Sequence, residues 1–170
     1  MDLQFSFYRP TSDDGKAVSQ LIRACPPLDT NSNYCNLLQC HHFADTSVAV
    51  RQADRLVGFI SGYLIPMRPD TLFVWQVAVA EQARGHGVAA KMINHILERK
   101  ACQAVDFIET TITETNSASW ALFERIGKSY AAPLSTEALF LSGEHFSEQH
   151  ESEMLVRIGP LQRVATAGKI

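Results

Sequence analysis

The feature of this sequence that most constrains its fold is a glycine-rich turn between an apolar strand and an amphipathic helix, within VWQVAVAEQARGHGVAAKMINHIL at residues 74–97. Gly85, Gly87 and Ala89 leave the backbone almost bare where the helix begins. Small residues let backbone N–H groups approach a ligand closely, and a helix N-terminus carries roughly +0.5 of an elementary charge. The stretch therefore predicts a seat for a phosphate group.

Two common nucleotide-binding motifs do not fit this turn. A dinucleotide fold uses G-x-G-x-x-G, and a phosphate-loop NTPase uses G-x-x-x-x-G-K followed by Ser or Thr. The sequence continues after Gly87 as Val-Ala-Ala-Lys-Met, which completes neither motif. The alternative interpretation is purely structural: the glycines permit a tight strand-to-helix turn and bind nothing.

Length and composition indicate one ordinary globular domain. The chain has 170 residues, and we place the domain at residues 1–160, followed by a flexible tail at residues 161–170. The net charge of −3 supplies no footprint for nucleic acid. No apolar run reaches the roughly 20 residues that cross a bilayer, and the N-terminus MDLQFSFYRP does not resemble a signal peptide. We therefore expect a cytoplasmic protein with no membrane partner.

The cysteines and histidines do not form a persuasive metal site. Cys25, Cys35, Cys40 and Cys102 form no C-x-x-C pair, so we expect reduced thiols. The local grouping Cys40-His41-His42 is weak, because adjacent residues on a helix point about 100° apart. We predict no metal and no nucleophilic cysteine.

Hydrophobic periodicity and turn residues predict alternating strands and helices. The predicted strands cover residues 5–9, 46–51, 55–65, 72–79, 105–113 and 153–158. A first helix follows capping residues 11–14 and ends near Ala24, and others cover residues 34–43, 87–102 and 116–127. Residues 66–70 are predicted to be a loop, and the chain after Gly127 to be irregular until the last strand.

The glycine turn, in this order of elements, resembles the GCN5-related N-acetyltransferase (GNAT) family over roughly residues 5–130. The family motif Q/R-x-x-G-x-G/A is matched by Arg84, Gly87 and Ala89. The resemblance implies a mixed α/β fold whose central, mostly antiparallel sheet is splayed at the coenzyme site and flanked by helices. It also implies acetyl-coenzyme A as co-substrate, its pyrophosphate lying on the turn. The coenzyme contacts we expect are Val77, Ala78, Val79, Arg84, Gly85, Gly87, Val88, Ala89 and Asn116.

Further blocks resemble one group within that family, the L-2,4-diaminobutyrate acetyltransferases of ectoine biosynthesis. The blocks are CPPLDTNSNYCNLL, LVGFISGY, RPDTLFVWQVAV, ETTITETNSASWALF and HESEMLVRIGPL. The resemblance implies direct acetyl transfer to the γ-amine of L-2,4-diaminobutyrate by a homodimer. Two departures from the superfamily pattern stand out: Glu81 occupies a common Pro position, and Phe123 the position of a Tyr that protonates the leaving thiolate.

Proton transfer and substrate recognition need other side chains. A primary amine with a pKa of about 10.4 is protonated at neutral pH, so the reaction needs a proton acceptor. Within the matching blocks, Tyr34 and His150 are the candidates for acid and base, and Asp29, Glu153 and Trp75 for substrate binding. Each has a structural alternative: a helix-start contact for Tyr34, a turn for Asp29, the core for Trp75, the surface for His150 and Glu153, and a helix cap for Asn116.

Two rival functions remain open on the sequence alone. Phe123 favours a coenzyme-binding module without catalysis. An enzyme that acetylates protein amines would need an open groove for a peptide, whereas the PPLDTNSNY segment indicates a closed pocket for a small cation.

Overall fold

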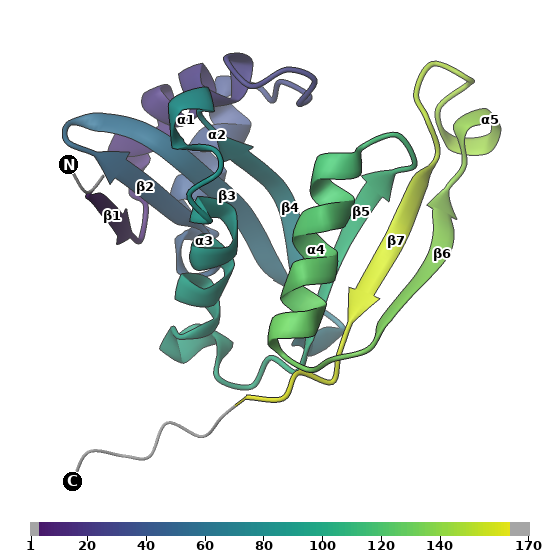
Figure 1. Ribbon diagram of the computed structural model, residues 1–170. Coiled ribbons are helices and arrows are strands. Elements are labelled where there is room, and N and C mark those ends of the chain that lie inside the picture. The colour runs from purple at the N-terminus through teal and green to yellow at the C-terminus, as the bar shows by residue number, and fades with distance from the viewer. Residues whose placement is uncertain (1–3, 164–170) are drawn as a thin grey trace, which may run out of the picture. The chain divides into compact units, whose positions relative to one another are not determined.

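The computed structural model describes residues 4–163 and divides into two compact units, Met1–Val105 and Asp106–Ile170. We describe each unit by itself, and the single domain predicted for residues 1–160 stays a prediction. The elements of the first unit, labelled in Figure 1, are β1 (Phe5–Tyr8), α1 (Gly15–Arg23), α2 (Asn33–His41), β2 (Val48–Gln52), β3 (Arg55–Ile65), β4 (Arg68–Val79) and α3 (Val88–Leu97).

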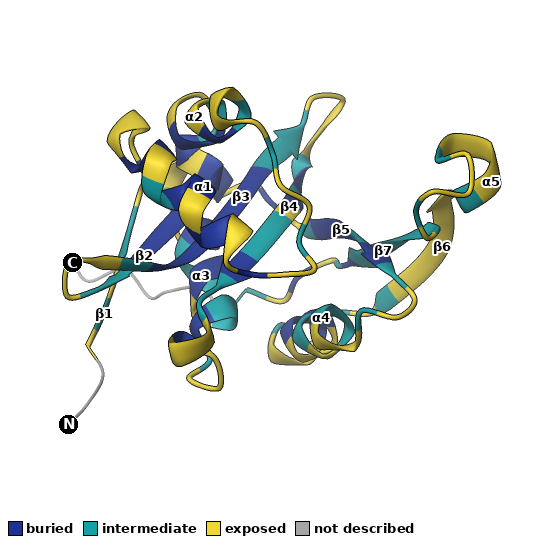
Figure 2. Ribbon diagram, turned by 90° about the horizontal axis from the view of Figure 1, so that it is seen from above, coloured by how far each residue is buried: buried dark blue, intermediate teal, exposed yellow. Residues whose placement is uncertain are grey.

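Strands β1 to β4 form an antiparallel sheet in sequence order, covered by helices on both faces (Figure 2). Side chains alternate across a strand, so neighbouring residues of β3 meet different helices. Phe59 packs with residues of α1 in one buried cluster, whereas a Cβ on Gly58 would meet the sulfur of Met92 in α3. The sheet is therefore buried on both sides, which explains its nearly continuous apolar strands.

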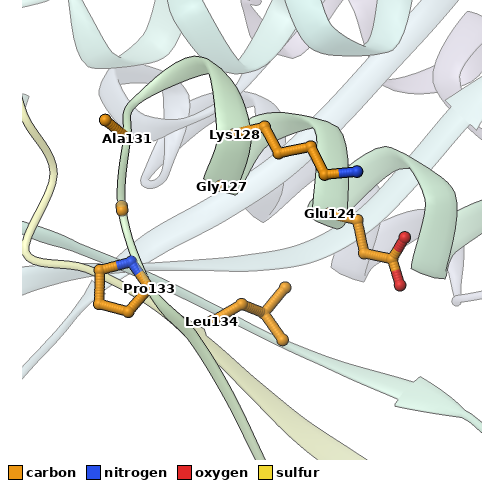
Figure 3. A pocket seen from close by; sticks show the side chains of 7 residues that line it. Glu124, Gly127, Lys128, Ala131, Pro133 and Leu134 are labelled. Atoms are coloured by element: carbon orange, nitrogen blue, oxygen red, sulfur yellow. The ribbon is translucent and has the colours of Figure 1, made fainter.

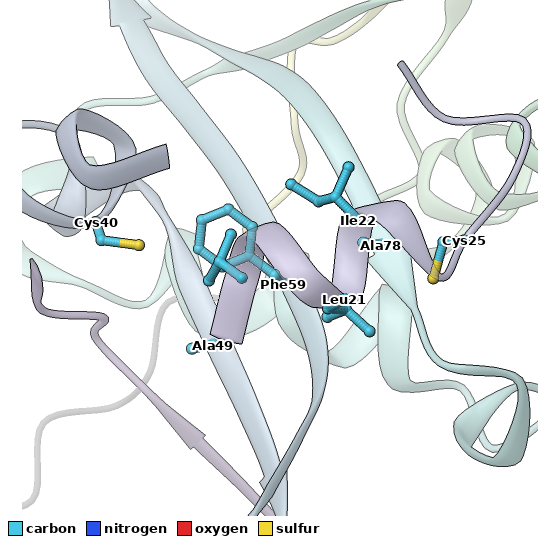
Figure 4. Packing of buried hydrophobic residues seen from close by; sticks show 8 residues of the cluster. Leu21, Ile22, Cys25, Cys40, Ala49, Phe59 and Ala78 are labelled. Atoms are coloured by element: carbon cyan, nitrogen blue, oxygen red, sulfur yellow. The ribbon is translucent and has the colours of Figure 1, made fainter. Parts of the chain in front are cut away.

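The core on the α1 face joins α1 to three strands (Figure 4). Leu21 and Ile22 of α1 pack with Ala49, Phe59 and Ala78, which stand side by side on β2, β3 and β4. Fully burying one Leu, Ile or Phe side chain contributes about 1.5–3 kcal/mol. Ala78 thus fixes the last residues of β4 against α1, just before the glycine turn.

A hydrogen-bonded cluster ties β1, β2 and the turn before α1 together. The Tyr8 hydroxyl donates to Asp14 Oδ1 over 2.8 Å, and Arg51 donates to both Tyr8 and Asp14. Burial, with Asp14 adding to it and Arg51 opposing it, raises the pKa of Tyr8 to about 12. The pKa of Asp14 is lowered: burial alone would raise it, but hydrogen bonds from the Thr11 N–H, Tyr8 and Arg51 outweigh burial.

Strand β4 contains a β-bulge beside β3. Ser61 pairs with Gln76 and the next residue, Gly62, pairs with Val74, so Trp75 is the extra residue. A bulge re-aims the side chains around it and is frequent next to functional sites. The side chains of Trp75 and Gln76 therefore do not follow the regular alternation of strand residues between the two faces of the sheet. Both residues lie in the middle of the predicted site.

The second unit consists of β5 (Phe107–Thr113), α4 (Ser117–Ser129), β6 (Leu134–Phe140), α5 (Ser142–His145) and β7 (Glu153–Ile158). Its strands pair antiparallel in the order β5, β7, β6. Arg157 of β7 forms an ion pair with buried Glu109 of β5 and lies 3.9 Å over the centre of the Phe107 ring. These contacts hold β7 in the middle of its sheet.

The predicted mixed α/β class is confirmed, and the strands pair antiparallel within each unit. Three element predictions were wrong. The chain after Gly127 is not irregular, since it forms β6 and α5; β4 begins at Arg68, within the predicted loop; and the predicted helix 87–102 ends as an α-helix at Leu97. β6 escaped prediction because it pairs with β7 alone and is exposed along nearly its whole length, so it shows little apolar alternation.

The predicted tail at residues 161–170 is described only as far as Arg163. Leu161 is buried and its N–H donates to the Asp106 carbonyl over 2.8 Å, and the N–H of Gln162 donates to the Tyr130 carbonyl over 3.0 Å. The remainder of the predicted tail, residues 164–170, lies outside the described residues.

Candidate coenzyme and substrate sites

The glycine turn has the open, left-handed backbone that its sequence predicts. Gly85 and Gly87 have φ angles of 79° and 70°, and Gly87 is the N-cap of α3 without a capping side chain. A Cβ built on either glycine would have no neighbouring atom within 4 Å. The first N–H groups of a helix have no partner inside it. The glycines therefore face open space rather than a packed neighbour, while their positive φ angles are also what a tight strand-to-helix turn requires, so both interpretations of the turn remain.

Arg84 lies at the junction between β4 and this turn. Its Nε donates to the carbonyl of Val79 over 3.1 Å, and the same carbonyl lies 3.5 Å from the Sγ of buried Cys25. Glu81, one of the two departures from the superfamily pattern noted in the sequence, begins a single 3-10 turn, Glu81–Ala83. The guanidinium is thus tethered beside the two glycines, where an anionic group on the helix end would meet a positive charge.

The other coenzyme residues predicted in this unit lie on each side of the turn. Val77, Ala78 and Val79 pair with Ile60, Phe59 and Gly58 of β3, and Ala78 is buried in the core. Val88 is buried at the first turn of α3, and Ala89 is partly exposed. The turn is consequently set between a fixed strand and a packed helix.

On the substrate side of the first unit, the predicted residues lie at the start of α2, in the loop before it and on β4. Tyr34 is the second residue of α2 and is 70% exposed, which is far from the packed position of a helix-start contact. Trp75 is 44% exposed and meets the ring of Tyr63 edge-on, with centroids 6.2 Å apart. The core interpretation of Trp75 therefore does not hold, since almost half of the ring remains accessible.

Asp29 lies in the loop before α2, and that loop is bonded to β4. The Asp29 carbonyl accepts a hydrogen bond of 2.8 Å from Gln76 Nε2, and Asn31 Nδ2 donates to Gln76 Oε1 over 3.0 Å. Gln76 and Asn31 were not predicted as site residues. The available signal was Gln76 itself, an amide between Trp75 and Val77 in an otherwise apolar strand.

Helix α2 buries two polar side chains and exposes two large hydrophobic ones, the opposite of the usual pattern for a helix beside the core. Asn36 and Gln39 are buried, and their carboxamides have no hydrogen-bond partner among residues 4–163. Tyr34 and Leu37 instead point outward, Leu37 with 40% exposure. The helix therefore presents apolar side chains to solvent beside the predicted substrate residues, although it lies next to the core.

In the second unit, His150 and Glu153 lie together. His150 Nδ1 is 2.7 Å from the carbonyl of Glu151, and its Nε2 is 3.9 Å from Glu153 Oε1. A carbonyl oxygen only accepts, so this contact places the proton of the neutral ring on Nδ1 and leaves Nε2 as its basic nitrogen. Packing against Phe146, with ring centroids 4.7 Å apart, holds the imidazole in place.

Asn116 has the structural role that was its alternative: its Oδ1 caps α4 by accepting from the N–H of Ser119 over 3.1 Å. Further along α4, Phe123 is buried with 1% exposure. An apolar ring can donate no proton, so Phe123 cannot supply the acid.

The surroundings of two of the cysteines disfavour a reactive thiolate. Burial and the charge of Asp14 raise the pKa of Cys40 to about 12, and burial raises the pKa of Cys35, which both disfavour the thiolate. Within residues 4–163, no group of three or more His, Cys, Asp or Glu is arranged to hold a metal ion. Every helix in that range falls short of the length and apolarity that crossing a bilayer requires.

A surface hollow of about 420 Å³ follows the C-terminal end of α4 (Figure 3). It is lined by Glu124, Gly127, Lys128, Ala131, Ala132, Pro133 and Leu134. None of the predicted site residues is among these lining residues.

Comparison with known proteins agrees with this geometry. Residues 16–127 match the model of the acetyltransferase (GNAT) family. The chain is 54% identical to the L-2,4-diaminobutyric acid acetyltransferase of Methylotuvimicrobium alcaliphilum, with 92% of this chain and 91% of the relative covered. It is 46% identical to the enzyme of that name in Chromohalobacter salexigens, covering 91% and 80% of the two chains.

Solved structures extend the comparison to the fold. Diaminobutyrate acetyltransferase EctA from Paenibacillus lautus, in complex with its substrate L-2,4-diaminobutyric acid and coenzyme A, superimposes with a TM-score of 0.89 at 38% identity, covering 93% of this chain and 96% of that one. The ribosomal-protein-S18-alanine N-acetyltransferase of Escherichia coli, at 12% identity, covers 98% and 100% with a TM-score of 0.69 and shares the fold.

Proposed function

Because the chain belongs to the acetyltransferase (GNAT) family, we propose that it transfers the acetyl group of acetyl-coenzyme A to the 4-amino group of L-2,4-diaminobutyrate. The observation that carries this proposal is the agreement along nearly the whole chain with a solved enzyme that holds this substrate and coenzyme A. The product, N4-acetyl-L-2,4-diaminobutyrate, belongs to the synthesis of the compatible solute ectoine.

The glycine turn fits the pyrophosphate of the coenzyme. Gly85 and Gly87 leave a space that side chains would fill, and the uncapped N-terminus of α3 offers N–H donors to an anion. Arg84 adds a charge-assisted contact beside them. The backbone of residues 77–79 is proposed to bind the pantetheine arm, and Asn116 to contribute from the start of α4.

When bound, the coenzyme supplies a thioester that the substrate amine attacks. His150 Nε2 accepts a proton from the 4-ammonium group, and Glu153 stabilises the imidazolium that forms. The hydroxyl of Tyr34 gives a proton to the departing thiolate, the task for which Phe123 is unsuited, and the tyrosinate that forms takes the second proton from the attacking nitrogen.

Two carboxylates and one ring are proposed to recognise the substrate. Asp29 and Glu153 supply the negative charge that a molecule with two ammonium groups requires. Trp75 lies against its short aliphatic chain, because nearly half of its ring is accessible. The exposed position of Asp29 in its loop leaves the carboxylate within reach of a small molecule.

The cellular setting is part of the same proposal. The enzyme acts in the cytoplasm as a homodimer and contributes to protection against osmotic stress. Support comes from its resemblance to the ectoine enzymes, from the acidic charge balance and from the apolar residues exposed on α2.

A panel of amines assayed with acetyl-coenzyme A tests this function. L-2,4-diaminobutyrate is expected to be acetylated with the highest kcat/KM, and NMR of the product to locate the acetyl group on N4. Preference for a peptide amine would favour a protein acetyltransferase, and coenzyme binding without turnover of any amine would favour a non-catalytic module. Either result would contradict the proposal.

A further inference from the structure

One carboxamide connects the loop before α2 to the strand that leads to the coenzyme turn. Gln76 donates through Nε2 to the backbone carbonyl of Asp29 and accepts through Oε1 from the side chain of Asn31. Both ends of the amide are therefore used by one loop, residues 26–32, in which Pro26, Pro27, Asp29, Thr30 and Ser32 are exposed.

The two ends of this loop are held by other contacts. Just before it, Cys25 is buried and its Sγ lies 3.5 Å from the Val79 carbonyl, and within its first half Leu28 packs against the α1 core. At its last residue, the hydroxyl of Ser32 caps α2 by accepting from the N–H of Cys35. Between Leu28 and Ser32, the bonds to Gln76 hold the polar segment that carries Asp29.

The bulge explains why Gln76 can reach this loop beside Trp75. Consecutive residues of a regular strand point to opposite faces. Here Trp75 meets Tyr63, which also contacts Phe43 just after α2, and Gln76 binds two residues just before α2. The extra residue thus directs two adjacent side chains toward the same helix.

We propose that Gln76 is a positioning residue for substrate selection: its carboxamide holds the backbone of Asp29 beside Trp75, so that the loop carboxylate decides which amine reaches the thioester. This inference rests on the proposed function, in which Asp29 and Trp75 bind diaminobutyrate. Gln76 itself acts through Asp29 and need not touch the substrate.

Two substitutions separate the bonds that Gln76 makes. Gln76→Met removes both hydrogen bonds while keeping the length of the side chain, and Gln76→Glu keeps the acceptor for Asn31 but loses the donor to Asp29. Two ordinary hydrogen bonds correspond to roughly a tenfold change in affinity. We expect the KM for diaminobutyrate to rise about tenfold in Gln76→Met and less in Gln76→Glu, with the KM for acetyl-coenzyme A unchanged.

Two further readouts distinguish positioning from a general structural role. In both Gln76 variants some acetylation should move to the 2-amino group, because Asp29 no longer holds its place. Asn31→Ala should raise the same KM, and its effect should not add to that of Gln76→Met, since the two residues share one bond. Ser61→Ala is the matched control: Ser61 stands opposite Gln76 on β3, and its buried hydroxyl has no hydrogen-bond partner in the part of the chain that the structure describes.

Amide hydrogen exchange of residues 28–32 tests the anchor without substrate. Faster exchange in Gln76→Met than in Ser61→Ala, together with the raised KM, supports the inference. Unchanged exchange overturns it, and so does faster exchange with a wild-type KM and pure N4 product. If the wild-type enzyme fails to acetylate diaminobutyrate, the proposed function fails by itself, and the KM comparison is made with the amine that the enzyme does acetylate.

Discussion

Gly87 combines two structural features: its backbone has a positive φ angle, and the space where a side chain would begin is open. Gly87→Val therefore combines strain with bulk, because β-branched residues rarely adopt positive φ. Gly87→Asn adds a side chain that tolerates this backbone. We expect steady-state kinetics to show a KM for acetyl-coenzyme A raised about tenfold or more in both variants, with the KM for the amine nearly unchanged. A folded Gly87→Asn enzyme with wild-type coenzyme KM would contradict the phosphate seat.

The geometry of His150 makes a specific kinetic prediction. With Nδ1 directed at a carbonyl, Nε2 is the nitrogen that takes the proton, so His150→Ala removes the base. We expect kcat to fall by about 10²–10⁴, and Tyr34→Phe to lower kcat through loss of the acid. His145→Ala is the control, since the ring of His145 accepts from the N–H of Leu141. Near-normal kcat in both His150→Ala and Tyr34→Phe would indicate that water, rather than these side chains, carries out the proton transfers.

Neutralising the proposed anchors should impair substrate recognition, and at Glu153 it should also lower kcat, because this carboxylate is proposed to stabilise the protonated His150 ring. A hydrogen bond to a charged group contributes roughly 1.5–3 kcal/mol. Asp29→Asn and Glu153→Gln should therefore each raise the KM for diaminobutyrate at least about tenfold and release some 2-acetylated product, measured by NMR. Asp54→Asn, at the exposed turn between β2 and β3, provides the matched neutralisation. Wild-type KM and pure N4 product in both anchor variants would exclude these carboxylates from recognition.

At the scale of elements, the cluster of Tyr8, Asp14 and Arg51 makes stability depend on alkaline pH. The pKa of Tyr8 rises from 10.0 to about 12 on folding. Its neutral form therefore contributes stability that is complete below pH 10 and is lost as the pH rises toward 12. Tyr8→Phe should lower the free energy of unfolding at pH 7 by about 2 kcal/mol. Urea unfolding from pH 7 to 12 should show the difference from wild type shrinking above pH 10, and a constant difference would contradict the assignment.

The elements that could be predicted are those with a strong apolar period or a side chain suited to a helix cap. Strands β2, β3 and β7 lie within two residues of their predicted bounds. β6 could not be predicted, because an exposed edge strand has little apolar pattern, and the early start of β4 depends on its pairing with β3. Local sequence therefore indicated the buried elements and missed those that only pairing defines.

The site residues likewise divide into those whose role is encoded locally in the sequence and those whose role depends on distant contacts. The glycine turn was predictable because a positive φ and an open helix end have a direct residue signature. The role of Gln76 was not, because it depends on a bulge and on a loop 45 residues away in the sequence. The partnership of His150 with Glu153 depends likewise on a loop turning back toward the start of β7.

For the molecule as a whole, coenzyme binding should appear as stability. A ligand that binds only the folded chain at 100 times its Kd adds about 2.7 kcal/mol to the free energy of unfolding. For a chain of this size, that corresponds to a rise of about 5–11 °C in Tm. Thermal unfolding with and without acetyl-coenzyme A measures this rise, which should nearly vanish in Gly87→Asn. An equal rise in that variant would place the coenzyme on a different surface.

The bulge in β4 also limits how this chain can change its length. Gln76 and Val74 pair with consecutive residues of β3 and so already point to opposite faces, which means that deleting Trp75 would restore regular pairing there and leave the other strand residues on their faces. Deleting or inserting one residue in a regular part of β4 would instead exchange the two faces for every strand residue on one side of the change. A substitution in β4 alters one side chain, whereas a length change outside the bulge re-aims a whole row of side chains. Across natural variants of this enzyme, the spacing between the β3–β4 turn and the glycines should therefore vary less than the residues that fill it.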